Sequence, residues 1–160
     1  MTAAAERALL RHTLATLAYR ARKALRDAPP EFATFRISDG TREPAKILAH
    51  MGDLMDWGLA LARGEKRWND STPLAWNDEV QRFFTALAAF DDCIASDAPL
   101  AVPAGALFQG PVADALTHVG QIALLRRMAG APVRGENYFR AEIVAGRIGT
   151  EQTPPRREFD

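Results

Sequence analysis

Apolar side chains recur at helical spacing in four long stretches of the chain, separated by polar segments rich in proline and glycine. Residues three and four apart lie on the same side of an α-helix, so each stretch presents one apolar stripe to a core. The pattern predicts helices over residues 3–27, 43–62, 77–96 and 110–130. Four amphipathic helices of this length favour an all-α fold, a four-helix bundle.

The second predicted helix carries an inner stripe made of Ile47, Met51, Leu54, Met55, Gly58 and Ala62. Thr41 is expected to cap this helix, and Pro44 suits its first turn, where an N–H group has no intrahelical partner. His50 lies at the edge of the stripe and is expected to face inward. Asp53 and Asp56 point further away and are interpreted as solvated, although Asp53 could orient a metal ligand.

The remaining segments are expected to be irregular. Segment 31–42 contains an Asp-Gly turn signal, and its apolar residues Phe32, Phe35 and Ile37 are expected to cover the core. Segment 131–160 alternates turns with short apolar pieces, which predicts a tail packed over a bundle formed by residues 1–130. The whole chain, residues 1–160, is therefore interpreted as a single domain.

Composition and charge exclude several classes of function. The chain has 160 residues, of which 48% are apolar and 25% charged, with twenty basic and twenty acidic side chains, so neither nucleic acid nor disorder is indicated. No segment resembles a signal peptide or a membrane span, and the expected location is the cytoplasm. The single Cys93 cannot form an internal disulfide and is interpreted as a buried structural thiol.

Asp114 and His118 are two ionisable side chains in an almost entirely apolar stretch, residues 111–125. Four residues apart on a helix, they lie on one face with Cβ atoms about 5–6 Å apart, where they could hold one metal ion. His50 is the best candidate for a third ligand, whereas His12 lies opposite the leucine stripe of its helix and is interpreted as solvated. The hypothesis is a mononuclear metal site of His50, Asp114 and His118; an Asp114–His118 ion pair without metal is the alternative.

The strings DALTHVGQIALLRRMAGAPV and ILAHMGDLMDW resemble the last and second helices of the DinB/YfiT-like family of four-helix-bundle metalloproteins. The resemblance implies that His50 and His118 take two ligand positions and that Gly120-Gln121 matches the family's Gly-Gln pair. Asp114 stands where the family has the first histidine of H-x-x-x-H. This departure gives two histidines and one carboxylate for one divalent metal ion, with zinc or nickel expected and iron or manganese as alternatives.

Four functions remain open from the sequence. The resemblance implies a metal-dependent S-transferase that acts with a low-molecular-weight thiol on a small-molecule substrate. A hydrolase using metal-bound hydroxide, a metal-binding stress protein without turnover and a bundle without metal are the alternatives. A homodimer is expected because the helices, the fourth especially, are apolar on more than one side.

Overall fold

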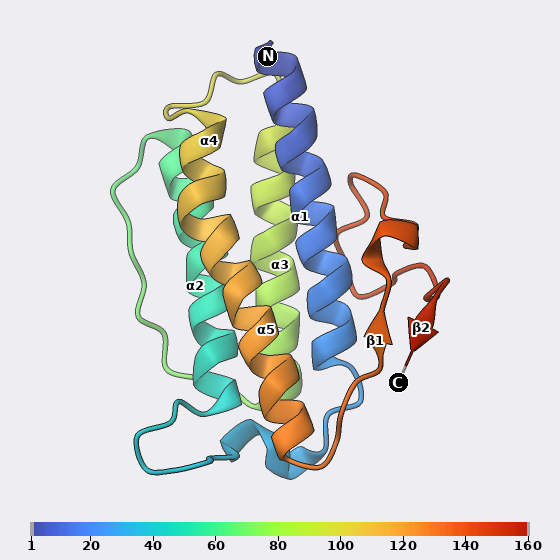
Figure 1. The fold of residues 1–160 in the computed structure, drawn as a ribbon. Helices are drawn as coiled ribbons and strands as arrows, with labels where there is room; N and C mark the ends of the chain where they lie inside the picture. The colour runs from blue at the N-terminus through green and yellow to red at the C-terminus, as the bar shows by residue number, and fades with distance from the viewer. Residues whose placement is uncertain (1, 160) are drawn as a thin grey trace.

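The computed structural model describes residues 2–159, and in this part of the chain four long helical rods pack side by side (Figure 1). Three of the rods are α1 (Ala3–Leu25), α2 (Pro44–Arg63) and α3 (Trp76–Ala95); the fourth combines α4 (Ala104–Leu107), the π-helical η2 (Phe108–Val112) and α5 (Ala113–Met128). Helices α1 and α2 each contact both α3 and α5, which closes a ring around the core. The predicted all-α four-helix fold is confirmed.

The inner stripe of α2 is buried as predicted, but the start of this helix differs. Glu43 takes the capping position and makes no side-chain hydrogen bond to the helix. The hydroxyl of Thr41 instead donates to the carbonyl of Ser38 over 2.7 Å, so the prediction that Thr41 caps α2 is wrong. Pro44 takes the first helical position, as expected for a residue without an N–H group.

The fourth rod begins at Ala104 and not at residue 110, so its predicted start is wrong. Pro111 lies inside the rod, within η2. Proline cannot donate the usual i→i−4 hydrogen bond and its ring crowds the preceding turn. A wider π-helical turn is one of the few ways in which a helix continues past such a disturbance.

The connection between α1 and α2 covers the bottom of the core only in part. Phe32, in the short 3₁₀ helix η1 (Pro30–Thr34), is buried and lies edge-on to Trp76 with ring centroids 5.5 Å apart. Phe35 packs partly against the core, whereas Ile37 is 47% exposed, so its predicted burial is wrong. Ile37 directly precedes the turn that begins at Ser38, which turns the chain outward.

The C-terminal segment is the irregular tail that the sequence predicts. It contains two two-residue strands, β1 (Gly135–Glu136) and β2 (Glu158–Phe159), which pair antiparallel, and the 3₁₀ helix η3 (Tyr138–Arg140). A Cβ atom at Gly135 would lie 2.5 Å from the ring of Phe159, so the ring packs directly over the backbone of β1. Ile148 is 5% exposed and packs into the core of the bundle.

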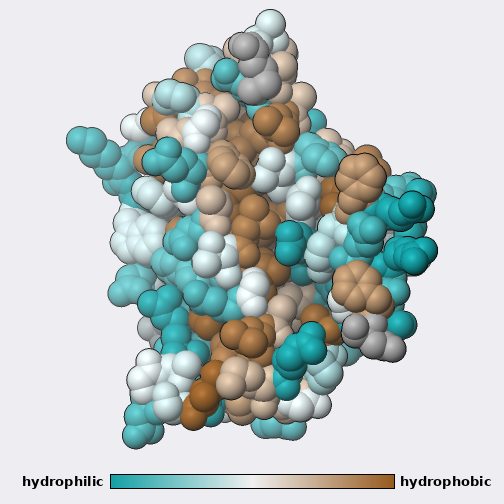
Figure 2. Space-filling model, viewed as in Figure 1, coloured by the Kyte–Doolittle hydropathy of each residue, from teal (hydrophilic) through white to brown (hydrophobic). Residues whose placement is uncertain are grey.

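Apolar side chains also reach the surface of the bundle. Figure 2 shows a brown band down the middle of one face, over the seam between α1 and the fourth rod. Four large apolar residues of these elements are about half exposed: Leu9, Phe108, Leu124 and Met128. A homodimer that covers such a surface stays a prediction. Within residues 2–159, no helix has the length and apolar character needed to cross a membrane.

Candidate metal centre

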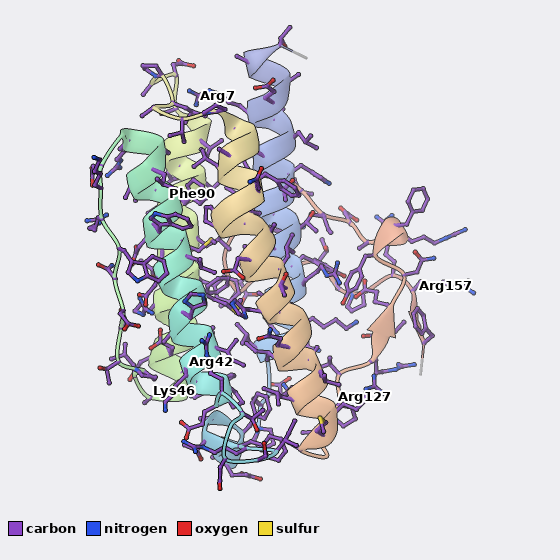
Figure 3. All side chains as sticks on the ribbon, turned by 60° about the vertical axis from the view of Figure 1, so that its left-hand side comes forward. Arg7, Arg42, Lys46, Phe90, Arg127 and Arg157 are labelled. Carbon is purple, nitrogen blue, oxygen red and sulfur yellow. The ribbon has the colours of Figure 1, made fainter. Side chains whose placement is uncertain are left out.

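His50, Asp114 and His118 come together between α2 and α5, which run in opposite directions on the side of the bundle that Figure 3 turns forward. Oδ2 of Asp114 lies 3.5 Å from Nε2 of His50, and Oδ1 lies 3.4 Å from Nε2 of His118. One ligand atom from each residue lies within 4.8 Å of the other two. This group could hold a metal ion.

Two separations in this group, each to a different oxygen of Asp114, agree with the spacing of ligands around one small divalent ion. Two ligand atoms about 2.1 Å from a tetrahedral ion are about 3.4 Å apart. The two carboxylate–imidazole separations, 3.5 and 3.4 Å, match that value. The donor set of two imidazole nitrogens and one carboxylate oxygen is also one that divalent zinc, nickel, iron and manganese accept.

The three side chains differ in their access to solvent, which gives the group an inner and an outer side. The side chain of His118 is 10% exposed and that of His50 is 27% exposed, whereas that of Asp114 is 47% exposed. The imidazoles therefore form the inner wall and the carboxylate lies towards the solvent.

Gln121 holds the ring of His118. Nδ1 of His118 donates to the amide oxygen of Gln121 over 2.8 Å, and the two residues are three apart on α5. With its proton on Nδ1, the imidazole keeps the lone pair of Nε2 free for an ion on the side of Asp114. The sequence predicts a packing or ligand-orienting amide at this position, and the hydrogen bond agrees with the orienting role.

Asp53 is buried, so its interpretation as a solvated carboxylate is wrong. It is 2% exposed, and it accepts hydrogen bonds from the backbone N–H and the hydroxyl of Ser71, over 2.9 and 2.6 Å. Nη1 of Arg82, from α3, lies 3.1 Å from its Oδ1. Asp53 thus fastens the loop after α2 and does not orient a histidine. Asp56 is also partly buried, and this burial raises its pKa even though Arg82 lies 3.9 Å away.

Two aromatic residues lie near the group: Trp57, which the sequence places on the same side of its helix as His50, and Trp68, which the sequence did not indicate. The ring of Trp68 is 5.7 Å from that of His50, and it is also 5.8 Å from the ring of Trp57, in both cases edge-on. The rings of His50 and His118 are themselves 4.9 Å apart. Trp68 belongs to a polar loop, where no periodicity signals what a side chain will contact.

Two other sequence interpretations concern residues outside the group. His12 is exposed, as predicted. Cys93 is a free thiol that is partly exposed in α3, so its predicted full burial is wrong. It lies at the edge of the core, because neighbouring side chains of α3 take the inner positions.

Comparison of the chain with models of known protein families, with curated proteins and with solved structures found no match. The resemblance to the DinB/YfiT-like family therefore stays a prediction, and the case for a function rests on His50, Asp114 and His118 themselves.

Proposed function

We propose that this protein is a mononuclear metal-dependent enzyme that holds one divalent ion through His50, Asp114 and His118. The observation that carries the proposal is the gathering of three ligand atoms within 4.8 Å on two packed helices. An exposed carboxylate by itself would not indicate a metal site, because such groups are common without a bound ion. Here two imidazoles meet the two oxygens of Asp114, and one of the imidazoles is oriented by Gln121, as metal-ligating histidines usually are by a hydrogen-bond partner.

The donor set supports a particular choice of metal. Imidazole nitrogen suits zinc and nickel, while a carboxylate oxygen also suits harder ions such as manganese and iron. With two imidazoles and one carboxylate, zinc or nickel is the proposed ion, and iron or manganese is the alternative. All three proposed ligands lie on the long helices α2 and α5, which fix their backbones.

The proposed reaction is S-transfer with a low-molecular-weight thiol. Three protein ligands leave at least one coordination position open, as in catalytic sites, and Asp114 is 47% exposed beside it. A divalent ion there supplies Lewis acidity, which lowers the pKa of a thiol placed at the open position. In the transfer, the thiol gives its proton to solvent, its sulfur bonds to the electrophilic carbon, and the leaving group departs with its electron pair.

A series of substitutions at Asp114 tests whether this residue is a ligand. After identical loading and dialysis of protein without a histidine tag, we expect metal content in Asp114→His at or above that of the parent. In Asp114→Ala it should fall far below, because one of three protein ligands is lost. Asp92→Ala, which removes an exposed carboxylate from α3, is the matched control. Equal metal content in Asp114→Ala and the parent would show that Asp114 only neutralises the histidines.

A second measurement separates S-transfer from the alternatives. We expect the metal-loaded protein to consume a small alkylating electrophile only when a low-molecular-weight thiol is also present. Ester hydrolysis without thiol would identify a hydrolase instead. A protein that binds metal stoichiometrically and is inert in both assays would fit the stress-protein alternative.

A further inference from the structure

We propose that the indole rings of Trp57 and Trp68 form, with His50, an aromatic wall that binds a planar aromatic group of the substrate. This inference rests on the proposed function and names its substrate class: molecules that combine a donor atom for the metal with a neutral aromatic ring. In this wall, Trp68 contacts both His50 and Trp57 edge-on. Trp68 is 50% exposed, whereas Trp57 is partly buried against the core.

Trp68 contacts the imidazole ring of His50, one of the three proposed ligands. Its centroid is 5.7 Å from that of His50, and the two planes meet at 66°. Its contact with Trp57 has a centroid distance of 5.8 Å and an interplanar angle of 89°. The indole of Trp68 therefore lies against one of the imidazoles that would hold the ion.

Hydrogen bonds at both ends hold the loop that carries Trp68. This loop, residues 64–75, runs along the outside of α2 (Figure 1) and is called the strap below. At its start, Gly64 adopts a left-handed conformation (φ 76°) that ends α2. Near its end, Ser71 donates twice to Asp53, and the N–H of Leu74 donates to Glu79 over 2.9 Å.

One of the fastenings near the end of the strap, from Ser71 to Asp53, lies beside the proposed metal centre. Asp53 follows His50 by three residues on α2, which is less than one helical turn. Ser71 follows Trp68 by three residues in the strap, so the bond between Ser71 and Asp53 places Trp68 next to His50. Asp53 and Glu79 are 2% and 0% exposed, and buried charged hydrogen bonds of this kind hold a loop firmly.

The exposure of Trp68 distinguishes it from a core residue. Its side chain is 50% exposed, although it is among the largest apolar groups a surface loop can carry. Trp76, by contrast, lies edge-on to the buried Phe32 and packs against the core. Asp114 and Trp68 both contact His50 and both are about half exposed, so both are accessible to a molecule that approaches His50 from the solvent.

Thiol binding to the cobalt-loaded protein tests this inference. We expect benzyl mercaptan to bind about threefold to tenfold more tightly than ethanethiol, the advantage that aromatic pairs typically confer. The absorption of the cobalt–thiolate bond reports binding directly. Trp68→Ala should reduce the preference to less than about twofold, Trp68→Phe should keep it, and Ser71→Ala should weaken it by loosening the strap. Trp76→Phe is the control, because the ring of Trp76, at the start of α3, contacts Phe32.

The outcomes separate the two proposals. Failure to bind cobalt would overturn the proposed metal centre and this inference with it. If both thiols bind with equal affinity, or if the preference survives in a folded Trp68→Ala variant, the aromatic wall is wrong while the metal centre stands. Tighter binding of thiocholine than of benzyl mercaptan would show recognition of a cation and would equally overturn the neutral aromatic class.

Discussion

Gln121 orients one ligand of the proposed metal centre, since its amide oxygen accepts a hydrogen bond from Nδ1 of His118 over 2.8 Å. We expect Gln121→Leu to weaken metal binding about 10- to 100-fold, the usual effect of removing a group that orients a ligand. Gln109→Leu, a change of an exposed glutamine in the same helical rod, should leave the affinity unchanged. Titration calorimetry with zinc measures both, and equal affinities would mean that the ring needs no such support.

Arg126 is a buried cation that stabilises the fold through hydrogen bonds to backbone carbonyls. It is 5% exposed, and Nη1 donates to the carbonyls of Ala24 and Arg26 while Nε donates to that of Ala131. The carbonyls near the end of α1 have no intrahelical partners, so the guanidinium satisfies them and joins α1 to α5. Burial lowers the pKa of Arg126, which nevertheless remains a cation because arginine starts so high.

At the scale of the helices, two glycines in similar helical positions have opposite surroundings. A Cβ atom at Gly58 in α2 would lie 2.6 Å from the ring of Phe90 in α3, whose side chain is labelled in Figure 3. At Gly120 in α5, by contrast, a Cβ atom would meet nothing within 4 Å. The first glycine therefore allows α2 and α3 to approach, whereas the second only costs backbone entropy.

We expect Gly58→Ala to destabilise the bundle by about 1–3 kcal/mol through overpacking. Gly120→Ala should stabilise it by about 0.4–1 kcal/mol, since alanine reduces the freedom of the unfolded chain. Urea unfolding followed by circular dichroism gives both values. Changes of the same sign in the two variants would mean that the close approach to Phe90 does not limit the packing of α2 on α3.

At the scale of the whole molecule, buried charges fasten the tail to the bundle. Nζ of Lys23 in α1 lies 2.8 Å from a carboxylate oxygen of Glu136 and 2.7 Å from one of Glu158. The hydroxyl of Tyr19 donates to Glu136 over 2.6 Å. Burial of Tyr19, aided by this hydrogen bond and the nearby carboxylate charge, raises its pKa. One lysine and one tyrosine of α1 therefore meet both short strands of the tail.

The attachment of the tail should depend on pH in the acid range. The hydrogen bond from Lys23 lowers the pKa of Glu158 below its ordinary value of 4.5. A carboxyl group with a lowered pKa stabilises the folded state above pH 4.5, and this contribution disappears as pH falls through the folded-state value. We expect the melting temperature of the parent to exceed that of Glu158→Gln at pH 7, with the gap closing progressively below pH 4.5.

Melting curves from pH 3 to pH 7 measure this effect. Glu31→Gln, which changes an exposed glutamate outside the tail, should show no comparable gap. A difference between the parent and Glu158→Gln that stays constant down to pH 3 would mean that the charge of Glu158 contributes nothing to the attachment.

The sequence by itself determined the four helices, because the 3.6-residue period of apolar positions depends only on neighbours along the chain. It also indicated Asp114 and His118, since residues four apart share a face of any helix. His50 was found by its place at the edge of an apolar stripe, and the packing of α2 on α5 bears out its inward position. Spacing along the sequence is therefore enough to predict which residues share a face, because the geometry of a single helix fixes it.

Only the tertiary structure decided the features in which segments far apart in the chain meet. Asp53 appears solvated on an isolated helix, but the strap and Arg82 of α3 bury it. Trp68 lies in a polar loop, and it reaches His50 because the hydrogen bonds between Ser71 and Asp53 hold this loop against α2. Thr41 does not cap α2 because its hydroxyl donates to the carbonyl of Ser38 in a turn. The fourth rod begins earlier than expected because a π-helical segment carries the helix past Pro111. A sequence pattern records what each residue prefers locally, whereas these outcomes depend on partners that only folding brings within reach.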